Sequence, residues 1–170
     1  MKNIELKIVC DNFGAIKNLL KIAKARFAGT LNQTDTYFKC KNGRLKLREI
    51  NKRYFELISY QRPDKKTSKL SDYQVIKLKK DEAEDMKRVL KKSLGEKVVV
   101  KKKRDLWIYE NTRIHLDFVE KLGNFLELET VLQIGDLEHF KNEHAKVIEL
   151  LGIENCKKIR GSYSDLLLAK

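Results

Sequence analysis

The stretch Asn3-Ile4-Glu5-Leu6-Lys7-Ile8-Val9 alternates between apolar and polar residues. Because successive side chains of a β-strand point to opposite faces, this alternation predicts a strand that is buried on one side. The other side carries Glu5 and Lys7, which have opposite charges and point the same way. We interpret this stretch as the first of a series of strands with one apolar face and one face of fixed charges.

Strands with the same pattern recur along the chain. They are predicted at residues 33–40, 44–48, 53–62, 71–78, 97–109, 113–119 and 124–132. Amphipathic patterns that end at glycines predict helices at 11–28, 81–94 and 136–151, and a short helix begins at Ser162. The Asn42-Gly43 dipeptide predicts a tight hairpin, and 64–70 a polar loop. We expect an α+β fold, an eight-stranded antiparallel β-barrel, closed or nearly closed, with flanking helices in a single domain spanning residues 1–170.

The composition is typical of a compact protein with an anionic partner. The chain has 170 residues, of which 42% are hydrophobic and 36% charged, and a formal net charge of +13. It contains no apolar run long enough to cross a membrane and no signal-peptide pattern at its start. Cys10, Cys40 and Cys156 are far apart and form no Cys-x-x-Cys motif. We expect reduced, buried or half-buried thiols in a cytoplasmic protein without a membrane partner.

The charged faces of the predicted strands carry both signs. If helices cover the apolar faces, these charges must line the interior, which is tolerable only when they are paired and hold a ligand or metal. A single Lys-x-Arg or Glu-x-Glu pair is usually a solvated face, but several strands agree here. The charged residues of this set beyond the first strand are Arg44, Lys46, Arg48, Arg62, Lys102, Arg104, Arg113, His115, Asp117, Glu127 and Glu129.

These residue types match two kinds of ligand. Arginine and lysine suit phosphate oxygens, whereas carboxylates suit hard divalent cations such as Mg²⁺ or Mn²⁺. Separate clusters of both signs therefore favour a metal-bridged polyphosphate. His115 is a conceivable proton acceptor, although one histidine on a strand is more often a hydrogen-bonding wall residue. We interpret His139 and His144, whose spacing is not that of a metal pair, as structural.

Short motifs in order along the chain carry a family resemblance. They are Asn3-Ile4-Glu5-Leu6-Lys7, Asp35-Thr36-Tyr37-Phe38, Gly43-Arg44-Leu45-Lys46-Leu47-Arg48-Glu49, Lys102-x-Arg104-x-x-Trp107, Arg113-x-His115-Leu116-Asp117, Glu127-Leu128-Glu129 and Ser162-Tyr163-Ser164-Asp165-Leu166-Leu167. Each motif is loose, but the ordered set is specific. Over essentially the whole chain it resembles the CYTH, or triphosphate tunnel, superfamily, and in particular its class IV adenylyl cyclase-like branch.

That resemblance implies an eight-stranded antiparallel tunnel, often dimeric, that binds a triphosphate along a basic wall. By position it implies that the phosphates are held by Lys7, Lys46, Arg48, Arg62, Lys102, Arg104 and Arg113, of which Lys7, Arg48 and Arg104 would also serve catalysis. It implies that Mg²⁺ or Mn²⁺ is held by Glu5, Asp117, Glu127 and Glu129. Asn3 stands where the family signature has its first Glu, and the loss of this carboxylate counts against a second metal site and against strong catalysis.

Several functions remain open at this stage. Triphosphate hydrolysis and the conversion of ATP to cyclic AMP and pyrophosphate would use the same residues, and no base-recognition motif separates them. A tunnel that binds a phosphorylated metabolite or an RNA 5′-triphosphate end without turnover is the alternative. Nonspecific nucleic-acid binding ranks last, because the sequence lacks interleaved exposed aromatic and basic residues.

Overall fold

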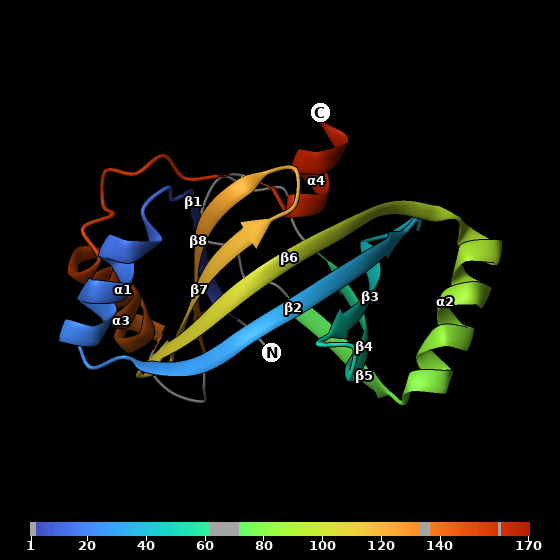
Figure 1. Ribbon diagram of the computed structural model, residues 1–170, viewed down its shortest axis with the longest axis horizontal. Helices are drawn as coiled ribbons and strands as arrows, with labels where there is room; N and C mark the ends of the chain where they lie inside the picture. The colour runs from blue at the N-terminus through green and yellow to red at the C-terminus, as the bar shows by residue number, and fades with distance from the viewer. Residues whose placement is uncertain (1–2, 62–71, 133–136, 160) are drawn as a thin grey trace.

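The computed structural model describes residues 3–61, 72–132, 137–159 and 161–170, which form eight strands and four helices (Figure 1). The strands are β1 (Asn3–Val9), β2 (Arg26–Phe38), β3 (Arg44–Ile50), β4 (Tyr54–Gln61), β5 (Asp72–Leu78), β6 (Glu96–Tyr109), β7 (Thr112–Val119) and β8 (Gly123–Val131). The helices are α1 (Phe13–Ile22), α2 (Lys80–Leu94), α3 (Leu137–Leu150) and α4 (Tyr163–Leu168).

All eight strands belong to one antiparallel sheet, in the order β1-β8-β7-β6-β2-β3-β4-β5. The long strands β2 and β6, of 13 and 14 residues, pair along the middle of the molecule (Figure 1). The predicted eight-stranded antiparallel sheet with flanking helices is confirmed. Its closure into a barrel is not, because within the described residues the edge strands β1 and β5 do not pair with each other. The sheet is strongly curled but open.

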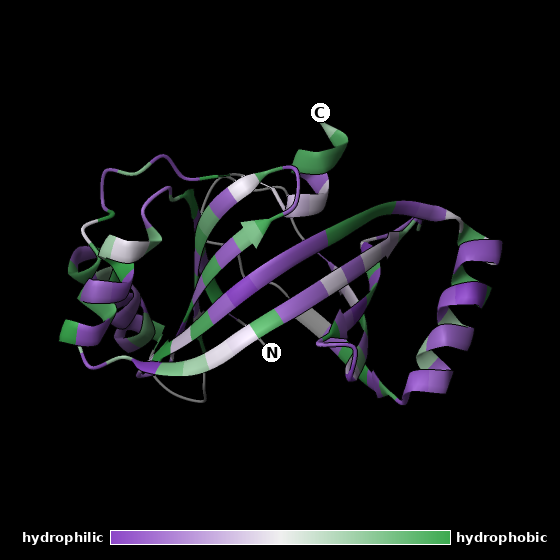
Figure 2. Cartoon of the chain, viewed as in Figure 1, coloured by the Kyte–Doolittle hydropathy of each residue, from purple (hydrophilic) through white to green (hydrophobic). Residues whose placement is uncertain are grey.

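Helices α1, α2 and α3 cover the apolar outer face of the sheet. Helices α1 and α3 lie at one end of the molecule and α2 at the other (Figure 1). One cluster joins Leu20 of α1 and Val147 of α3 to buried residues of β1, β6, β7 and β8. A second places Ala83 of α2 against β2, β3 and β4. Colouring by hydropathy shows a continuous hydrophilic stretch in the middle of β6 and a largely hydrophilic α2 (Figure 2). The charged strand faces therefore remain for the concave side.

A third apolar cluster closes part of the concave side. It contains Tyr163 of α4 together with buried residues of β2, β4, β6, β7 and β8. Ser162 caps α4, as predicted, by accepting a hydrogen bond from the Asp165 backbone N–H, while the Asp165 carboxylate accepts one from the Ser162 backbone N–H. Arg44 of β3 donates to both side chains, at 2.6 Å to Ser162 and 2.9 Å to Asp165. The C-terminal helix is thus fixed against the sheet.

The predicted helix over 11–28 is wrong at both ends. It begins at Phe13, with Asn12 as its cap, and ends at Ile22. Phe27, which falls inside the predicted helix, lies in β2 and packs on Trp107 with ring centroids 5.1 Å apart. Gly29, expected to end the helix, sits at a β-bulge of β2 with φ +127°. Pairing with β6 extends β2 back to Arg26 and overrides the local helical pattern.

The structure agrees with the predicted second helix and with the predicted turn at Gly43. Helix α2 starts at Lys80 and ends before Gly95, and Gly43 adopts φ +66° between β2 and β3. Cys40 is exposed, so the expectation of a buried or half-buried thiol is wrong for this residue, while Cys10 and Cys156 are half-buried. The predicted loop at 64–70 and the helix start at residue 136 lie outside the described residues. Within the described ranges, no helix has the length and apolar character needed to span a membrane.

Candidate triphosphate and metal site

The concave side of the sheet holds a cavity of about 520 Å³. Its size suits a ligand of nucleotide dimensions. The lining side chains come from all eight strands and from the start of α4, and most of them are charged. The charged lining residues are Glu5, Lys7, Asp35, Lys46, Arg48, Glu56, Lys77, Lys102, Arg104, Arg113, Glu127 and Glu129.

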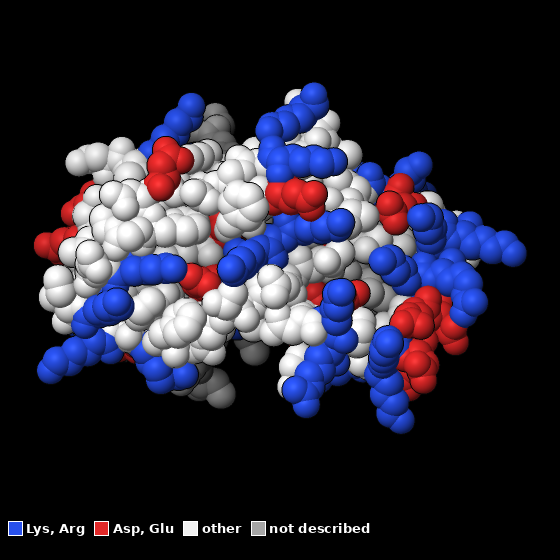
Figure 3. Space-filling view, in the orientation of Figure 1, with Lys and Arg blue, Asp and Glu red and all other residues white. Residues whose placement is uncertain are grey.

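Strand register brings these residues together. In β1 and β8, Glu5 lies opposite Glu129 and Lys7 opposite Glu127. Because directly opposite residues share a face of the sheet, the predicted alternation places whole rows of charge inside the cavity. Lys101 and Lys103, the neighbours of buried Lys102, are exposed, as alternation requires. Lysine and arginine side chains also stud the outer surface, densely over α2 (Figure 3), so the net charge is not confined to the cavity.

One part of the cavity, here named the basic wall, is formed by Lys46 and Arg48 of β3 and Lys102 and Arg104 of β6. Asp35 of β2 holds the first two. Its carboxylate accepts hydrogen bonds from Arg48 at 2.7 and 2.8 Å and from Lys46 at 2.9 Å. Although burial raises the pKa of Asp35, Arg48 and Lys46 bring it well below its usual range. The cations are therefore fixed before any ligand binds.

Asp117 of β7 holds the other half of the basic wall. Arg104 donates to both of its oxygens at 2.6 Å and to Glu127 at 2.8 Å. Tyr163 donates its hydroxyl to Asp117 at 2.8 Å. Burial raises the pKa of Asp117, but Arg104 and Lys102 outweigh it and lower the pKa to about 2. Asp117 is fully buried, and its oxygens are engaged by these donors.

Lys102 is the least favourably placed cation of the basic wall. Its ammonium is 3.9 Å from the nearest Asp117 oxygen, and it lies 5.1 Å from the centre of the Tyr163 ring. Burial, followed by repulsion from Arg104, lowers the pKa of Lys102 to about 7. Attraction to Asp117 and Asp35 offsets only part of the free-energy cost of removing the Lys102 ammonium from water. An anion in the cavity would supply the missing counter-charge.

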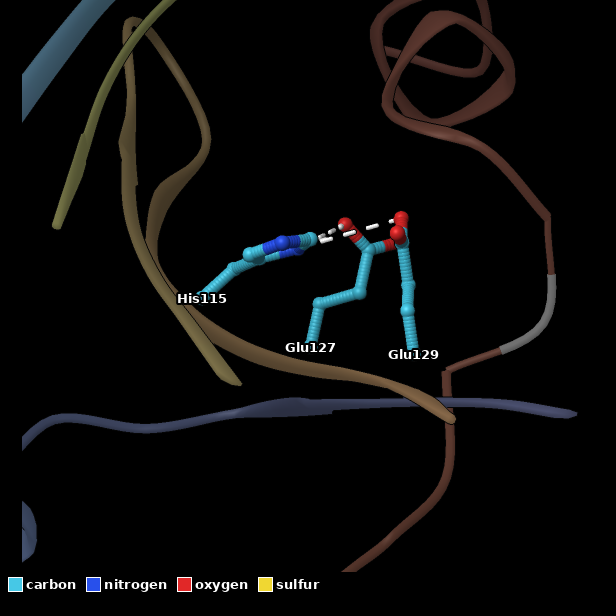
Figure 4. Close-up of side chains that lie close together, drawn as sticks. All are labelled: His115, Glu127 and Glu129. Carbon is cyan, nitrogen blue, oxygen red and sulfur yellow. Dashed lines mark ion pairs between the residues drawn. The ribbon is translucent and has the colours of Figure 1, made fainter. Parts of the chain in front are cut away.

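The other part of the cavity is lined by Glu5 of β1 and by Glu127 and Glu129 of β8. These three residues and the buried His115 of β7 beside them are here named the acidic wall. His115 Nδ1 lies 3.5 Å from Glu127 and 3.8 Å from Glu129, and the imidazole ring and both carboxylates converge (Figure 4). One ligand atom from each of the three lies within 4.8 Å of the others. This is the spacing expected of residues that can share one metal ion.

Cations flank the acidic wall. Lys7 lies 3.0 Å from Glu127, and Arg113 lies 3.4 Å from Glu129. Burial raises the pKa of Glu127, but Lys7 contributes most to holding it well below its usual range. Both glutamates are consequently ionised at neutral pH, and the pKa of Glu129 is also lowered. Burial, aided by Arg104, lowers the pKa of His115, so its imidazole is neutral under the same conditions.

The structure brings together almost the whole predicted set. Glu5, Glu127 and Glu129 line the same cavity as the predicted phosphate-binding residues Lys7, Lys46, Arg48, Lys102, Arg104 and Arg113. Arg62 lies outside the described residues. Asp117 is brought close as well, but its carboxylate contacts Arg104 and Tyr163 rather than the cavity. Its predicted role as a metal ligand stays a prediction that this geometry does not favour.

The sequence analysis missed Asp35, which fixes two cations, and the position of Tyr163 between Lys7 and Lys102. Asp35 shares the strand parity of buried Gln33 and Tyr37, a usable signal that was already present in the predicted strand at 33–40. Its partnership with Arg48 follows only from the register of β2 and β3. Tyr163 lies far from these residues in sequence, and no local pattern predicts its contact with Asp117.

Comparisons with known proteins agree with this architecture. A family model described as the CYTH domain matches residues 1–163. A protein of Methanocaldococcus jannaschii named as a putative adenylate cyclase is 29% identical over 180 residues, which cover 98% of this chain and 98% of that protein.

Solved structures of similar fold cover nearly the whole chain. The PH1012 protein of Pyrococcus horikoshii has a TM-score of 0.81 at 26% identity, covering 96% of this chain and 98% of its own. A Hippeastrum protein described as a putative adenylyl cyclase with a dominant triphosphatase activity has a TM-score of 0.71 at 14% identity, covering 98% of this chain and 95% of its own. This last likeness concerns the fold.

Proposed function

Because the chain belongs to the CYTH domain family, we propose that it is a metal-dependent enzyme that acts on the triphosphate of a nucleotide or of a related organic or inorganic compound. The observation that carries the proposal is a single cavity in which a fixed basic wall adjoins a buried acidic wall. A polyphosphate needs several cations at different positions, and a divalent cation needs carboxylates beside it. This cavity supplies both sets.

In this proposal the cations bind the phosphate oxygens. Arg48 and Arg104 are held by Asp35 and Asp117, so they meet the substrate without reorganisation. Lys7, Lys46, Lys102 and Arg113 line the same cavity and add positive charge. Phosphoryl transfer depends mainly on positioning and on charge neutralisation, which is the role we assign to Lys7, Arg48 and Arg104 as catalytic residues.

The acidic wall fits a divalent cation. Two carboxylates of like charge lie side by side at Glu127 and Glu129, and the cation nearest to Glu129, Arg113, is 3.4 Å away. Such a pair favours a bound counter-charge of the Mg²⁺ or Mn²⁺ type. Glu127 and Glu129, with Glu5 on the adjacent strand, would hold the ion. When bound, it supplies charge neutralisation and polarisation at the phosphate oxygens.

Two reactions are compatible with this cavity. Attack of a water on the terminal phosphorus releases phosphate, whereas attack of a ribose 3′-hydroxyl on the first phosphorus releases pyrophosphate and yields cyclic AMP. The relative named as a putative adenylate cyclase supports the second, and the fold shared with a protein of dominant triphosphatase activity accords with the first. We also propose a cytoplasmic location, which the free cysteines support, and a homodimer.

A non-catalytic binder of phosphorylated metabolites or of RNA 5′-triphosphate ends is the second candidate, and Asn3 is the observation in its favour. Asn3 is buried, lines the cavity and leaves its side-chain oxygen without a hydrogen-bond partner. A neutral amide at this position reduces the charge available for a second cation. The phosphate-binding cations would be unaffected.

The deciding experiment is incubation with ATP or tripolyphosphate in the presence of Mg²⁺ or Mn²⁺, with the products resolved as phosphate, pyrophosphate or cyclic AMP. We expect turnover that disappears when a chelator is added and returns with metal. Release of phosphate identifies a hydrolase, and cyclic AMP with pyrophosphate identifies a cyclase. Tight triphosphate binding without any product would overturn the enzymatic proposal in favour of the binder.

A further inference from the structure

The imidazole of His115 has an unexplained nitrogen. The ring is buried, with 3% of its surface exposed, and Nδ1 has no hydrogen-bond partner. A buried polar atom without a partner costs roughly 1–3 kcal/mol, so in a native structure it needs an explanation. The atom faces the acidic wall, where Figure 4 shows it directed toward the carboxylates of Glu127 and Glu129. A ligand bound at this point would account for it.

The distances fit ligands of one ion better than a direct contact. Nδ1 lies 3.5 Å from Glu127 and 3.8 Å from Glu129, whereas charge-assisted N–H···O⁻ hydrogen bonds are about 2.7–2.9 Å. Two protein atoms that each lie about 2.1 Å from one cation are separated by about 3–4 Å. The three side chains offer ligand atoms within 4.8 Å of one another. A small inward movement would complete a shared site.

We infer that His115 Nδ1 is the third protein ligand of the cation held by Glu127 and Glu129, and that this nitrogen makes the site select Mn²⁺ over Mg²⁺. Imidazole is a good ligand for first-row transition ions, whereas Mg²⁺ prefers oxygen ligands and retains its waters. The strand register supports the assignment, because His115 lies directly opposite Glu127 across β7 and β8. The inference rests on the proposed function only for the presence of a divalent cation.

The competing explanation is that a protonated His115 acts as the counter-charge of the two glutamates and binds no metal. The two explanations differ in what surrounds a bound Mn²⁺ ion. Pulsed electron paramagnetic resonance detects nitrogen directly bonded to Mn²⁺, and it can be applied to the wild-type protein without substrate. The chain has three histidines, so labelling histidine with ¹⁵N changes only their signals. His139, exposed on α3, supplies a matched control.

The experiment compares wild type, His115→Gln and His139→Gln loaded with Mn²⁺. We expect histidine-nitrogen modulation that shifts on ¹⁵N labelling in wild type and in His139→Gln, and that is lost in His115→Gln. In calorimetric titrations, His115→Gln should weaken Mn²⁺ binding about tenfold or more while changing Mg²⁺ affinity less than about threefold. The wild-type spectrum remains decisive even if His115→Gln folds poorly.

Two results would overturn the inference. Mn²⁺ that binds wild type without histidine-nitrogen modulation would show that His115 is not a ligand, as would equal losses of Mn²⁺ and Mg²⁺ affinity in His115→Gln. The proposed function would survive both results. If wild type binds neither ion, with or without tripolyphosphate, the metal part of the proposed function fails as well.

Discussion

The basic wall and the acidic wall of the cavity differ in how closely their charged side chains are paired with partners of opposite charge. In the basic wall, Asp35 and Asp117 accept short hydrogen bonds of 2.6–2.9 Å from the cations that they hold. In the acidic wall, Glu127 has close contacts with Lys7 at 3.0 Å and Arg104 at 2.8 Å. Arg113 and His115 approach Glu129 only to 3.4 and 3.8 Å, and each retains a nitrogen without a hydrogen-bond partner. Three of the four cations of the basic wall are held by short hydrogen bonds, whereas the acidic wall has nitrogens without a hydrogen-bond partner.

This difference separates two ways of holding buried charge. Paired charges tolerate burial because each partner replaces lost water, and removing one partner destabilises the folded protein because the other charge is left buried without a counter-charge. Pairing is less complete in the acidic wall, and the divalent cation that we propose there would offset part of the free-energy cost of burying its carboxylates. Variants of the basic wall should therefore affect the free energy of unfolding, while variants of the acidic wall should chiefly affect metal-dependent activity.

The largest expected effect is that of Asp117→Asn on stability. Removing this carboxylate leaves Arg104 and Lys102 buried with less counter-charge, and breaking a buried pair costs about 3–5 kcal/mol. Urea denaturation should show a loss of this order. Glu84→Gln, which removes an exposed ion pair with Lys80, should change the free energy of unfolding by less than about 1 kcal/mol. A similarly small loss for Asp117→Asn would contradict the view that Asp117 supplies the counter-charge of Arg104 and Lys102.

The lowered pKa of the same carboxylate predicts that the free energy of unfolding depends on pH in the acid range. The folded-state pKa of Asp117 is lowered to about 2 from 3.8, so its contribution to stability is present above pH 4 and is lost as the pH falls toward 2. Wild type should lose stability across this window. Asp117→Asn has no carboxylate to protonate at this position, so its denaturation midpoint should fall less than that of wild type between pH 5 and pH 2.

The next effect in size is that of Glu127→Gln on turnover. This change removes a charge from the acidic wall while preserving side-chain shape, and we expect metal-dependent activity to fall by about a hundredfold or more. The fold should be retained, as judged by circular dichroism. Glu120→Gln, at an exposed position outside the cavity, is the matched control and should keep full activity. Unchanged activity in Glu127→Gln would exclude this residue from the site.

The sequence predicted the interior rows of charge because they depend only on strand alternation. Lys46, Arg48, Glu127 and Glu129 were assigned to the cavity from parity alone, and the structure confirms this location. It could not predict how the rows meet, since Asp35 and Arg48 become neighbours through the pairing of β2 with β3. The helix over 11–28 failed for a similar reason, because long-range pairing with β6 decides where β2 begins.

Local sequence patterns also could not predict whether the sheet closes into a barrel or that His115 is a candidate metal ligand. Counting eight strands suggested a barrel, but whether the first and last strands pair depends on the curl of the whole sheet. His115 has the parity of a wall residue in sequence. Its significance comes from an orphaned nitrogen and from its register with Glu127, both of which are three-dimensional properties.

A smaller effect is expected for Arg48→Ala on ligand stabilisation. A ligand at a hundredfold excess over its Kd adds about 2.7 kcal/mol of stability, which raises Tm by about 5–10 °C in a protein of this size. Tripolyphosphate should approach this shift and orthophosphate should not, because only the longer anion reaches several cations. Arg48→Ala should reduce the shift measured from its own unliganded Tm, while the exposed Arg88→Ala should not. Equal shifts with both anions, or a shift undiminished in Arg48→Ala, would indicate a merely basic surface.

The smallest expected effect is the uptake of less than about one proton by Lys102 when a polyanion binds. Its folded-state pKa is lowered to about 7 from 10.5, chiefly by burial and then by Arg104. The unfolded chain therefore binds more protons than the native protein between these values, and stability should rise with pH across that window. Lys102 is the one cation of the basic wall that no short contact to Asp35 or Asp117 holds, its nearest Asp117 oxygen being 3.9 Å away. A polyanion beside Lys102 would stabilise the ammonium and raise its pKa.

Tripolyphosphate binding at pH 8 should accordingly take up a fraction of a proton. Calorimetry in buffers of different ionisation enthalpy measures this uptake as the slope of the observed enthalpy against the ionisation enthalpy. Lys102→Met should lower the slope, and the exposed neighbour Lys103→Met should leave it unchanged, which separates uptake by the protein from that of the ligand. If the slopes of wild type and Lys102→Met coincide, Lys102 is already charged in the free protein. Asp35 and Asp117 would then suffice for all four cations, and the basic wall would need no anion to complete it.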